Sequence, residues 1–239
     1  MKDPNTKAED VMRELAALGN PQVAVFFLGF FQAGPGGYGE GDSFRGIRIP
    51  AMRLVARKYR GLPFPEAKRL LASKFHEDRI AALEILIHLF AKGDGKLKEK
   101  IYLLYAGSAR HINNWDLVDG SAPHILGAWL EDKPKSPLYK LARSKNLWER
   151  RMAMIATLRY IRKGRFEEAL RIAEMLIEAP EDLLHKASGW MLREIGKRDR
   201  GVEEAFLASH YRRMPRTMLR YAIEHFPEPR RQAYLKGKA

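Results

Sequence analysis

Apolar residues recur at helical spacing through most of this chain, and that periodicity constrains its fold more than any other feature. In residues 79–90, the side chains of Ile80, Leu83 and Ile87 fall along one stripe of a helix, and residues 151–161 repeat the pattern. The alternation of apolar and polar residues that marks β-strands is nearly absent. The sequence therefore predicts an all-α protein.

Proline and glycine residues separate these apolar stripes at the points where helices are expected to begin and end. Because the connections are short, each helix is expected to pack beside its neighbours in the sequence. Asn113 and Asn114 are expected to form the N-cap of the helix that begins at Trp115. The predicted helices cover residues 7–18, 21–32, 50–60, 65–73, 79–90, 96–109, 114–130, 137–143, 151–161, 166–178, 183–197, 202–211, 216–225 and 228–236.

Two helix starts are similar at a separation of 72 residues, which is twice 36. Residues 77–83 read EDRIAAL and residues 149–155 read ERRMAMI. A period of one helix pair per 36 or so residues predicts an α-solenoid, which is a stack of antiparallel helical hairpin repeats. Such stacks curve, and their inner helices line a concave cleft. We predict that residues 1–239 form a single domain of this architecture.

The chain carries a large excess of positive charge, with 43 lysine and arginine residues against 29 aspartate and glutamate residues and a net charge of +14. Such a charge on a folded domain favours binding to a polyanion such as duplex DNA, and it makes the predicted concave cleft basic. The alternative is that the charge serves solubility alone. A hydrophobic content of 46% is typical of a globular protein rather than a disordered one.

The composition also excludes several classes of protein. No segment contains the roughly 18 consecutive apolar residues that a membrane span requires. The first residues, MKDPNTKAEDV, lack the apolar core of a signal peptide. The chain has no cysteine, which excludes disulfides, thiolate nucleophiles and zinc sites built on sulfur. We expect a cytoplasmic, nucleoid-associated protein with no membrane partner.

One long irregular segment, residues 34–46, contains six glycines among its thirteen residues. A segment this flexible is not expected to be a buried core element. It also lacks the GxxxxGK[ST] pattern and the preceding strand of a phosphate-binding loop. We therefore expect a surface loop that can contact a ligand, with Tyr38 and Phe44 as its only large side chains.

The repeat register gathers four side chains that can carry chemistry. Positions 115, 151 and 187 are equivalent in this register, so they are expected on neighbouring inner helices. Asp119 lies one turn after Trp115, and Trp190 lies one turn after position 187. The register therefore predicts that Trp115, Asp119, Arg151 and Trp190 share one patch of the concave surface.

Each of these residues also has a purely structural interpretation. A tryptophan in a helix most often packs in the core, and we predict that role for Trp129 and Trp148. Asp119 and Arg151 could form an ion pair that ties adjacent repeats together. Core positions seldom alternate Trp, Asp, Arg and Trp along one line, however, and this favours a functional patch.

Two indoles and a carboxylate suit a reaction that develops positive charge on its substrate. Indole faces stack on bases, sugars and cations. A carboxylate between them would stabilise the oxocarbenium-like transition state of glycosidic cleavage, or orient the attacking water. An N-alkylated base is already cationic and leaves readily, so we expect no metal and no cofactor. The seven histidines have no metal-ligand spacing and are interpreted as surface residues or as residues with satisfied hydrogen bonds.

Three runs of residues resemble the AlkD-type DNA alkylation repair glycosylases. These runs are INNWDLVD at 112–119, WERRMA at 148–153 and KASGWMLRE at 186–194, and the resemblance extends to RGIRIP at 45–50 and TMLRYAIE at 217–224. It implies HEAT-like helical repeats around a basic concave cleft. It further implies a glycosylase that acts on duplex DNA in base excision repair. No lysine stands out as a Schiff-base nucleophile, so we expect a monofunctional enzyme, and we expect a monomer. The expected substrates are cationic alkylated purines, 3-methyladenine and 7-methylguanine, which the family does not enclose in a pocket.

The resemblance also implies two groups of site residues. The catalytic group supplies two indoles that contact the deoxyribose of the damaged nucleotide and a carboxylate that stabilises the oxocarbenium ion, and it comprises Trp115, Trp190 and Asp119. The DNA-binding group comprises Arg151, Arg150 and Tyr38. One alternative stays open, which is a non-catalytic HEAT-repeat module that binds nucleic acid.

Overall fold

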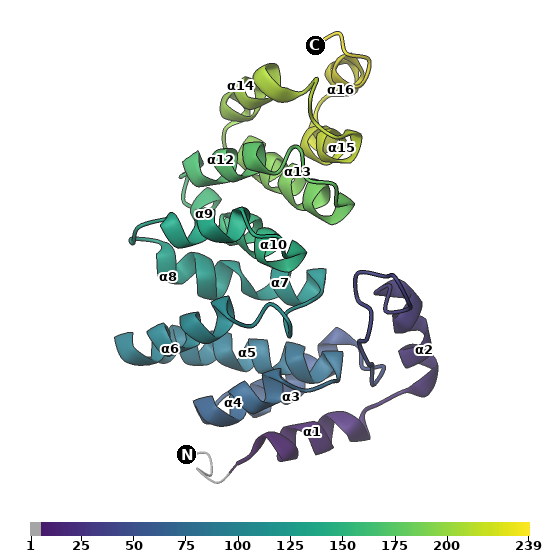
Figure 1. Cartoon of the computed structure of the whole chain (residues 1–239), viewed down its shortest axis with the longest axis vertical. Coiled ribbons are helices and arrows are strands. Elements are labelled where there is room, and N and C mark those ends of the chain that lie inside the picture. The colour runs from purple at the N-terminus through teal and green to yellow at the C-terminus, as the bar shows by residue number, and fades with distance from the viewer. Residues whose placement is uncertain (1–5) are drawn as a thin grey trace. The chain divides into compact units, whose positions relative to one another are not determined.

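The computed structural model describes residues 6–239, and helices account for its regular structure throughout (Figure 1). Within that part of the chain the extended pairing is limited to a single bridge between Ser43 and Phe75. The predicted all-α class and the stack of helical repeats are confirmed. None of the helices in residues 6–239 is long and apolar enough to cross a membrane.

Contacts divide the chain into two compact units, the first ending at Ser121 and the second beginning at Ala122. The first contains α1 (Ala8–Ala17), α2 (Pro21–Phe30), α3 (Ile49–Lys58), α4 (Phe64–Leu71), α5 (His76–Lys92), α6 (Gly95–Ala106) and α7 (Trp115–Ser121). The second contains η1 (Pro123–Gly127), α8 (Ala128–Leu130), α9 (Ser136–Ala142), α10 (Leu147–Ala156), α11 (Leu158–Ile161), α12 (Glu167–Met175), α13 (Asp182–Gly196), α14 (Arg200–His210), α15 (Arg216–Ala222), η2 (Ile223–His225) and α16 (Glu228–Leu235). That residues 1–239 act as one domain stays a prediction.

The long helix α5 is the centre of the first unit. It packs against α3, α4, α6 and α7, while α1 covers α3 and α4 (Figure 1). The apolar stripe of α5 buries Leu83 and Leu86, and the helices that pack on it bury Met52 of α3 and Leu70 of α4. Burial of each such side chain contributes roughly 1.5–3 kcal/mol, so this stripe anchors the unit.

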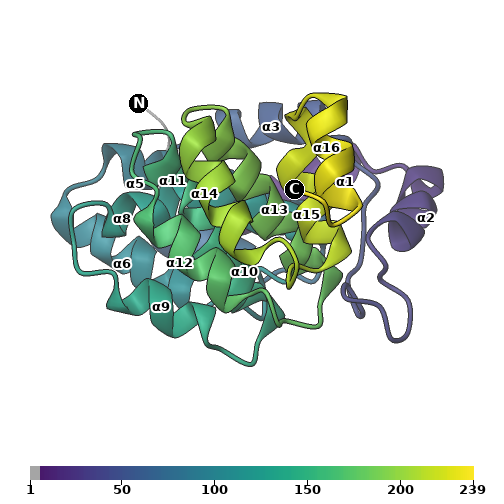
Figure 2. The ribbon, with the colours of Figure 1, turned by 90° about the horizontal axis from the view of Figure 1, so that it is seen from above.

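The long helix α13 has the corresponding place in the second unit. It packs against α10, α12, α14 and α15, and Figure 2 shows it between α14 and α15. The approach to α15 is close, because a Cβ atom at Gly189 would lie 2.4 Å from the carbonyl oxygen of Met218. Only glycine permits that approach without displacing the helix backbone.

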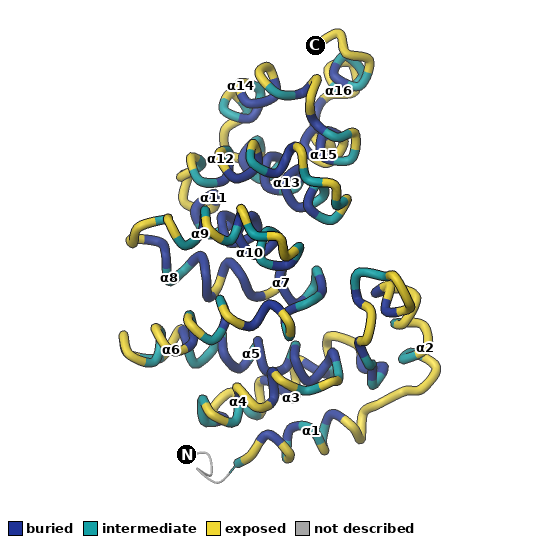
Figure 3. Tube along the Cα trace, viewed as in Figure 1, coloured by how far each residue is buried: buried dark blue, intermediate teal, exposed yellow. Residues whose placement is uncertain are grey.

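The amphipathic pattern fails at α2, which contains no buried residue (Figure 3). The start of the helix is stabilised by its own N-cap. The Asn20 side chain accepts a hydrogen bond from the Val23 N–H (3.1 Å), and Pro21 occupies the first helical position. Its apolar side chains stay largely in solvent, with Val25 69% and Phe26 62% exposed. An apolar helix surface of this kind is typical of a binding surface.

The single helix predicted over residues 114–130 is interrupted. A π-helical turn occupies Pro123–Gly127, between α7 and α8, and the Gly127 N–H donates to the Ala122 carbonyl oxygen at 2.9 Å. Proline has no N–H to donate and its ring crowds the preceding turn, so an α-helix cannot run through Pro123 undisturbed. The extent of the predicted segment is right, but its continuity is wrong.

A buried carboxylate, Glu203, lies at the contact between α14 and α13. The residue is 2% exposed, and its Oε1 atom has no hydrogen-bond partner. A Cβ atom at Gly196 would overlap the carboxyl group, so glycine at that position makes room for it. Burial raises the pKa of Glu203 from 4.5 to about 8, and the positive charge of Arg200 only partly opposes the shift.

This pKa predicts a pH-dependent stability. Between pH 4.5 and about 8 the folded chain keeps the Glu203 proton and the unfolded chain releases it, so stability falls as pH rises through that window. The Glu203→Gln variant removes this titration and should raise the free energy of unfolding at pH 8 by about 1–3 kcal/mol, with little gain at pH 4.5. Urea unfolding at both pH values measures the difference. An equal gain from Glu167→Gln, which alters an exposed carboxylate on α12, would contradict the explanation.

Candidate functional site

A pocket of about 420 Å³ opens in the first unit, bordered by α2, α3, α5 and α7. Its apolar and aromatic lining consists of Phe27, Phe30, Phe31, Ile47, Ile49, Met52, Ile80 and Trp115. Its polar lining consists of Arg53, His76, Glu77, Asp116 and Asp119. We call this hollow the aromatic pocket. Two residues of the predicted catalytic group, Trp115 and Asp119, therefore line the same pocket.

Trp115 forms one wall of the aromatic pocket rather than part of a closed core. It is the first residue of α7, where its N–H donates to the Asn114 side chain at 2.9 Å. The indole stacks on Phe31 with ring centroids 5.6 Å apart and meets Phe30 edge-on at 6.0 Å. These contacts fix the orientation of the ring and leave it partly exposed to the pocket.

Asp119 lies one helical turn after Trp115, and this spacing brings both side chains to the face of α7 that lines the pocket. It is half-buried, and its charge is close enough to affect Tyr105. Burial raises the pKa of Tyr105 well above its ordinary value, and the Asp119 carboxylate adds to that shift. Asp119 therefore brings negative charge to an otherwise mostly apolar pocket.

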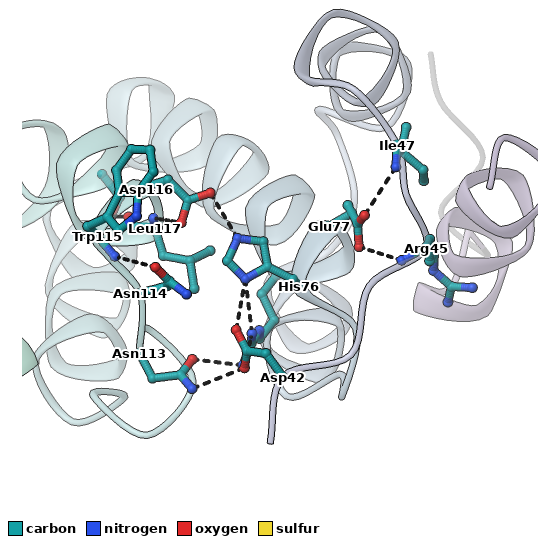
Figure 4. A network of polar contacts seen from close by, with 12 residues as sticks. Asp42, Arg45, Ile47, His76, Glu77, Asn113, Asn114, Trp115, Asp116 and Leu117 are labelled. Carbon is teal, nitrogen blue, oxygen red and sulfur yellow. Dashed lines mark hydrogen bonds and ion pairs between the residues drawn. The ribbon is translucent and has the colours of Figure 1, made fainter. Parts of the chain in front are cut away.

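A buried imidazole links the pocket to the glycine-rich loop (Figure 4). His76 is 1% exposed, and its Nε2 atom lies 2.8 Å from Asp116 Oδ2 while its Nδ1 atom lies 3.0 Å from Asp42 Oδ2. Burial alone would lower the pKa of His76, but the hydrogen bonds to Asp116 and Asp42 outweigh burial and raise it above 6.5. His76 therefore bridges two carboxylates that favour its protonated form, in which both ring nitrogens are donors.

Arg79 and Asn113 complete the contacts around Asp42. The guanidinium of Arg79 lies 2.7 Å from Asp42 Oδ1, and it also donates to Asn113 Oδ1 at 2.9 Å. The Asn113 amide donates to Asp42 at 3.1 Å. Burial would raise the pKa of Asp42, but His76 and Arg79 hold it below its ordinary value. The predicted N-cap role is therefore divided, because Asn114 bonds the start of α7 and Asn113 binds the loop.

Glu77 and Asp78, the next residues of α5, bind the end of the loop. The buried Glu77 carboxylate accepts hydrogen bonds from the main-chain N–H groups of Arg45, Gly46 and Ile47 at 2.8–3.1 Å. Asp78 forms two hydrogen bonds with the Arg45 guanidinium, at 2.8 and 2.9 Å. Sequence reasoning used residues 77–79 only to define the repeat, and it interpreted His76 only as a surface residue or one with satisfied hydrogen bonds. Four consecutive ionisable residues at the start of an apolar helix were the available signal.

The expectation that residues 34–46 lie on the surface is wrong for the second half of the loop. Gly34 and Gly36 are exposed, but Asp42 and Phe44 are buried, and Phe44 stacks on Phe31 with ring centroids 5.2 Å apart. A Cβ atom at Gly39 would lie 2.5 Å from the Phe31 carbonyl oxygen. Some of the glycines therefore permit close packing rather than flexibility. Tyr38 is half-buried, and its predicted contact with DNA stays a prediction.

The remaining predicted site residues belong to the second unit. Trp190 is half-buried on α13, and its indole N–H donates to Glu194 at 3.3 Å. Arg150 of α10 forms an ion pair with Glu181. The predicted structural role of Trp148 agrees with its 7% exposure, and Trp129 is half-buried beneath the Lys133 ammonium group. That Trp190 and the arginines share one patch with Trp115 and Asp119 stays a prediction.

Arg151 is buried, with 4% of its surface exposed, and it has the same role in α10 that Arg79 has in α5. The Arg79 guanidinium donates to Asn113, 34 residues later, and the Arg151 guanidinium donates to the Leu183 carbonyl oxygen, 32 residues later. The two arginines are 72 positions apart, as the predicted repeat requires. Burial and this hydrogen bond support a structural contribution by Arg151, and its contact with DNA stays a prediction.

Loss of the imidazolium bridge should destabilise the first unit. In the His76→Gln variant, Asp42 and Asp116 lose a shared cation, and the free energy of unfolding should fall by about 3 kcal/mol at pH 6. Because the folded pKa of His76 is raised above 6.5, the stabilisation is complete below pH 6.5 and is lost as pH rises through the folded value. Urea unfolding of both proteins at pH 6 and pH 9 measures this. A difference that does not shrink at pH 9 would show that the bridge does not depend on the charged imidazole.

Comparison with known proteins gives the fold and the family. The sequence matches the family described as DNA alkylation repair enzyme over residues 11–226. A solved structure described as a predicted DNA alkylation repair enzyme from Enterococcus faecalis superposes with a TM-score of 0.69 at 15% identity, covering 88% of this chain and 97% of that chain. No curated protein sequence matches the chain. The family match spans most of the sequence, and this protein belongs to the DNA alkylation repair enzyme family.

Proposed function

We propose that this protein is a monofunctional DNA glycosylase that hydrolyses the N-glycosidic bond of cationic alkylated purines in duplex DNA. The expected substrates are 3-methyladenine and 7-methylguanine, and the reaction requires no metal or cofactor. Membership of a family of DNA repair enzymes and a net charge of +14 support a DNA substrate. On this proposal the chain acts as a monomer and a single domain, in the cytoplasm with the nucleoid.

One observation carries the proposal, which is that an indole and a carboxylate one turn apart on α7 line the same aromatic pocket. Trp115 offers a ring face and edge to a sugar or a cationic base. Asp119 brings a negative charge into surroundings of low polarity, where its interaction with a developing cation is stronger than in water. A pocket intended only for an apolar group would gain nothing from a carboxylate.

The chemistry needs little beyond these two groups. As the bond between C1′ and the purine nitrogen breaks, its electrons neutralise the positive charge of the alkylated ring, so the base leaves without a general acid. The sugar becomes an oxocarbenium ion, which the Asp119 carboxylate stabilises. A water molecule adds its oxygen to C1′, and Asp119 orients it and accepts the proton that it loses. The products are a free base and an abasic site.

The other predicted residues have supporting roles in this proposal. Trp190 supplies the second indole against the deoxyribose, and Arg151 and Arg150 hold the DNA backbone beside the lesion. Tyr38 makes an aromatic contact from the glycine-rich loop. The base itself stays outside an enclosed pocket, so selectivity depends on the ease with which a cationic base leaves.

The Asp119→Asn variant tests the catalytic role directly. It should lower the rate of 7-methylguanine release from methylated duplex DNA by about 100-fold or more, because the oxocarbenium ion loses its counter-charge. DNA affinity should stay level or rise slightly, since a negative charge near phosphate is lost. Single-turnover release of the base and fluorescence anisotropy with the same duplex measure the two effects.

A matched control is Glu99→Gln, which removes an exposed carboxylate from α6. It should leave both quantities unchanged. Normal release by Asp119→Asn would remove this residue from the mechanism. Absence of release by the unaltered protein, together with tight DNA binding, would favour the alternative of a non-catalytic nucleic-acid-binding module.

The Arg151→Ala variant separates DNA binding from structure. If the guanidinium contacts a phosphate, the slope of log affinity against log salt concentration should become shallower by about 1. If Arg151 acts only through its hydrogen bond to the Leu183 carbonyl oxygen, the slope is unchanged and the free energy of unfolding falls. Salt titrations of duplex binding and urea unfolding of the same variant decide between the two roles.

A further inference from the structure

A second hollow in the first unit, of about 260 Å³, lies between α3 and α5. It is lined by Arg53, Ala56, Arg57, Arg60, Glu84 and His88. We call it the arginine pocket. Three guanidinium groups face a single carboxylate in this hollow, so its net charge is positive.

The spacing of the arginines explains why they meet there. Positions 53, 57 and 60 are separated by four and three residues, which brings them to one side of α3 and the turn that follows it. Lys58 is on another face and pairs with Glu14 of α1 at 2.5 Å. The small, buried side chain of Ala56 lies between the arginines and leaves room for a bound group.

Only one of the three guanidinium groups is neutralised. Arg53 forms an ion pair with Glu84 at 3.1 Å. Arg57 and Arg60 are exposed, and among residues 6–239 neither has a carboxylate partner. Like charges one turn apart repel each other and cost stability, and a bound anion removes that cost. Guanidinium groups bind phosphate oxygens through paired hydrogen bonds, which makes a phosphate group the best-matched anion.

Arg53 connects this hollow to the candidate site. Its side chain lines both the arginine pocket and the aromatic pocket, in which Trp115 and Asp119 lie. A ligand that spans the two hollows would present a phosphate on one side of Arg53 and a sugar or base on the other. A nucleotide within a DNA strand has these groups in adjacent positions.

We propose that the arginine pocket binds a phosphodiester group of the DNA strand whose damaged nucleotide places its deoxyribose against the aromatic pocket. Arg57 and Arg60 hold the phosphate oxygens, and Arg53 lies between the two pockets. This inference rests on the proposed function for the identity of the strand, but not for the binding of phosphate. The contact sets the register of the DNA and reads no base, as phosphate contacts do in general.

The first experiment measures salt dependence with unmodified duplex DNA, so it does not require base excision. The double variant Arg57→Gln and Arg60→Gln should bind more weakly, with a slope of log affinity against log salt that is shallower by about 1–2. The control is the double variant Lys96→Gln and Lys100→Gln. These lysines are exposed on α6, which packs on α5 and lies apart from α3 (Figures 1 and 2). Equal slopes for the two double variants would overturn the proposal.

The second experiment locates the phosphate. A set of duplexes, each with one abasic-site analogue and one neutral methylphosphonate, is compared for binding to the unaltered protein and to the arginine variant. One methylphosphonate near the abasic site should weaken binding of the unaltered protein about as much as the arginine substitutions do. The same change should have no further effect on the variant, because the partner of that phosphate is already lost. Additive effects at every position would overturn the proposal.

The third measurement separates the DNA backbone from a small phosphate ligand. Calorimetry with inorganic phosphate and pyrophosphate should show binding far weaker than that of duplex DNA. Tight binding of either ion, combined with an unchanged DNA salt slope in the arginine variant, would overturn the assignment to DNA. Failure of base release with an altered salt slope would instead count against the proposed glycosylase and leave the phosphate contact standing.

Discussion

The ionic contacts at the start of α5 hold the candidate site together. Residues 76–79 carry four buried ionisable side chains, which are tolerated only because each finds an opposite charge or hydrogen-bond partner. Their partners come from the glycine-rich loop before α3 and from the segment that begins α7. The same contacts therefore fix two segments that are far apart in the sequence, and the aromatic pocket lies where they meet. The ionic cluster and the ring contacts of Phe31 with Phe44 and Trp115 therefore hold the same two segments together.

Aromatic walls and carboxylates have complementary effects in such a pocket. The rings exclude water and offer negative faces, and the lower local polarity strengthens the attraction between a carboxylate and a cation. Asp116 is already occupied by His76, and Glu77 by three main-chain N–H groups, so these acids contribute architecture. Asp119 lines the same pocket from α7, and the proposed chemistry assigns it the role of counter-charge to the substrate. The hydrogen bonds of Asp116 and Glu77 could not be read from composition, which does not distinguish these two acids from Asp119.

Local structure could be predicted from the sequence, and tertiary structure only in part. The helix limits follow from apolar spacing, prolines and caps, so Ala8–Ala17 and Asp182–Gly196 match predicted segments to within a residue or two. The placement of Trp115 and Asp119 on one side of a helix followed from their spacing.

The bridge from Asp42 to His76 joins residues 34 positions apart, and no periodicity encodes such a pairing. Glycine was interpreted as flexibility, although at Gly39 it permits close packing. The burial of Arg151 was not predicted. An arginine on an inner helix can contact a phosphate or donate to a main-chain carbonyl oxygen, and the sequence pattern is the same in both cases.

The paired arginines, Arg79 and Arg151, have a consequence for how such a stack can grow or shrink. Each guanidinium is supplied by one hairpin and donates a hydrogen bond to an acceptor more than 30 residues later, so this donor and acceptor belong to different repeats. A duplication or deletion that begins inside this span separates a buried cation from this acceptor and therefore lowers the stability of the fold. A whole module that carries a guanidinium at one end and an acceptor at the other keeps this pairing when it is inserted. The unit of evolutionary change in this architecture is therefore defined by a hydrogen bond rather than by the boundaries of its helices.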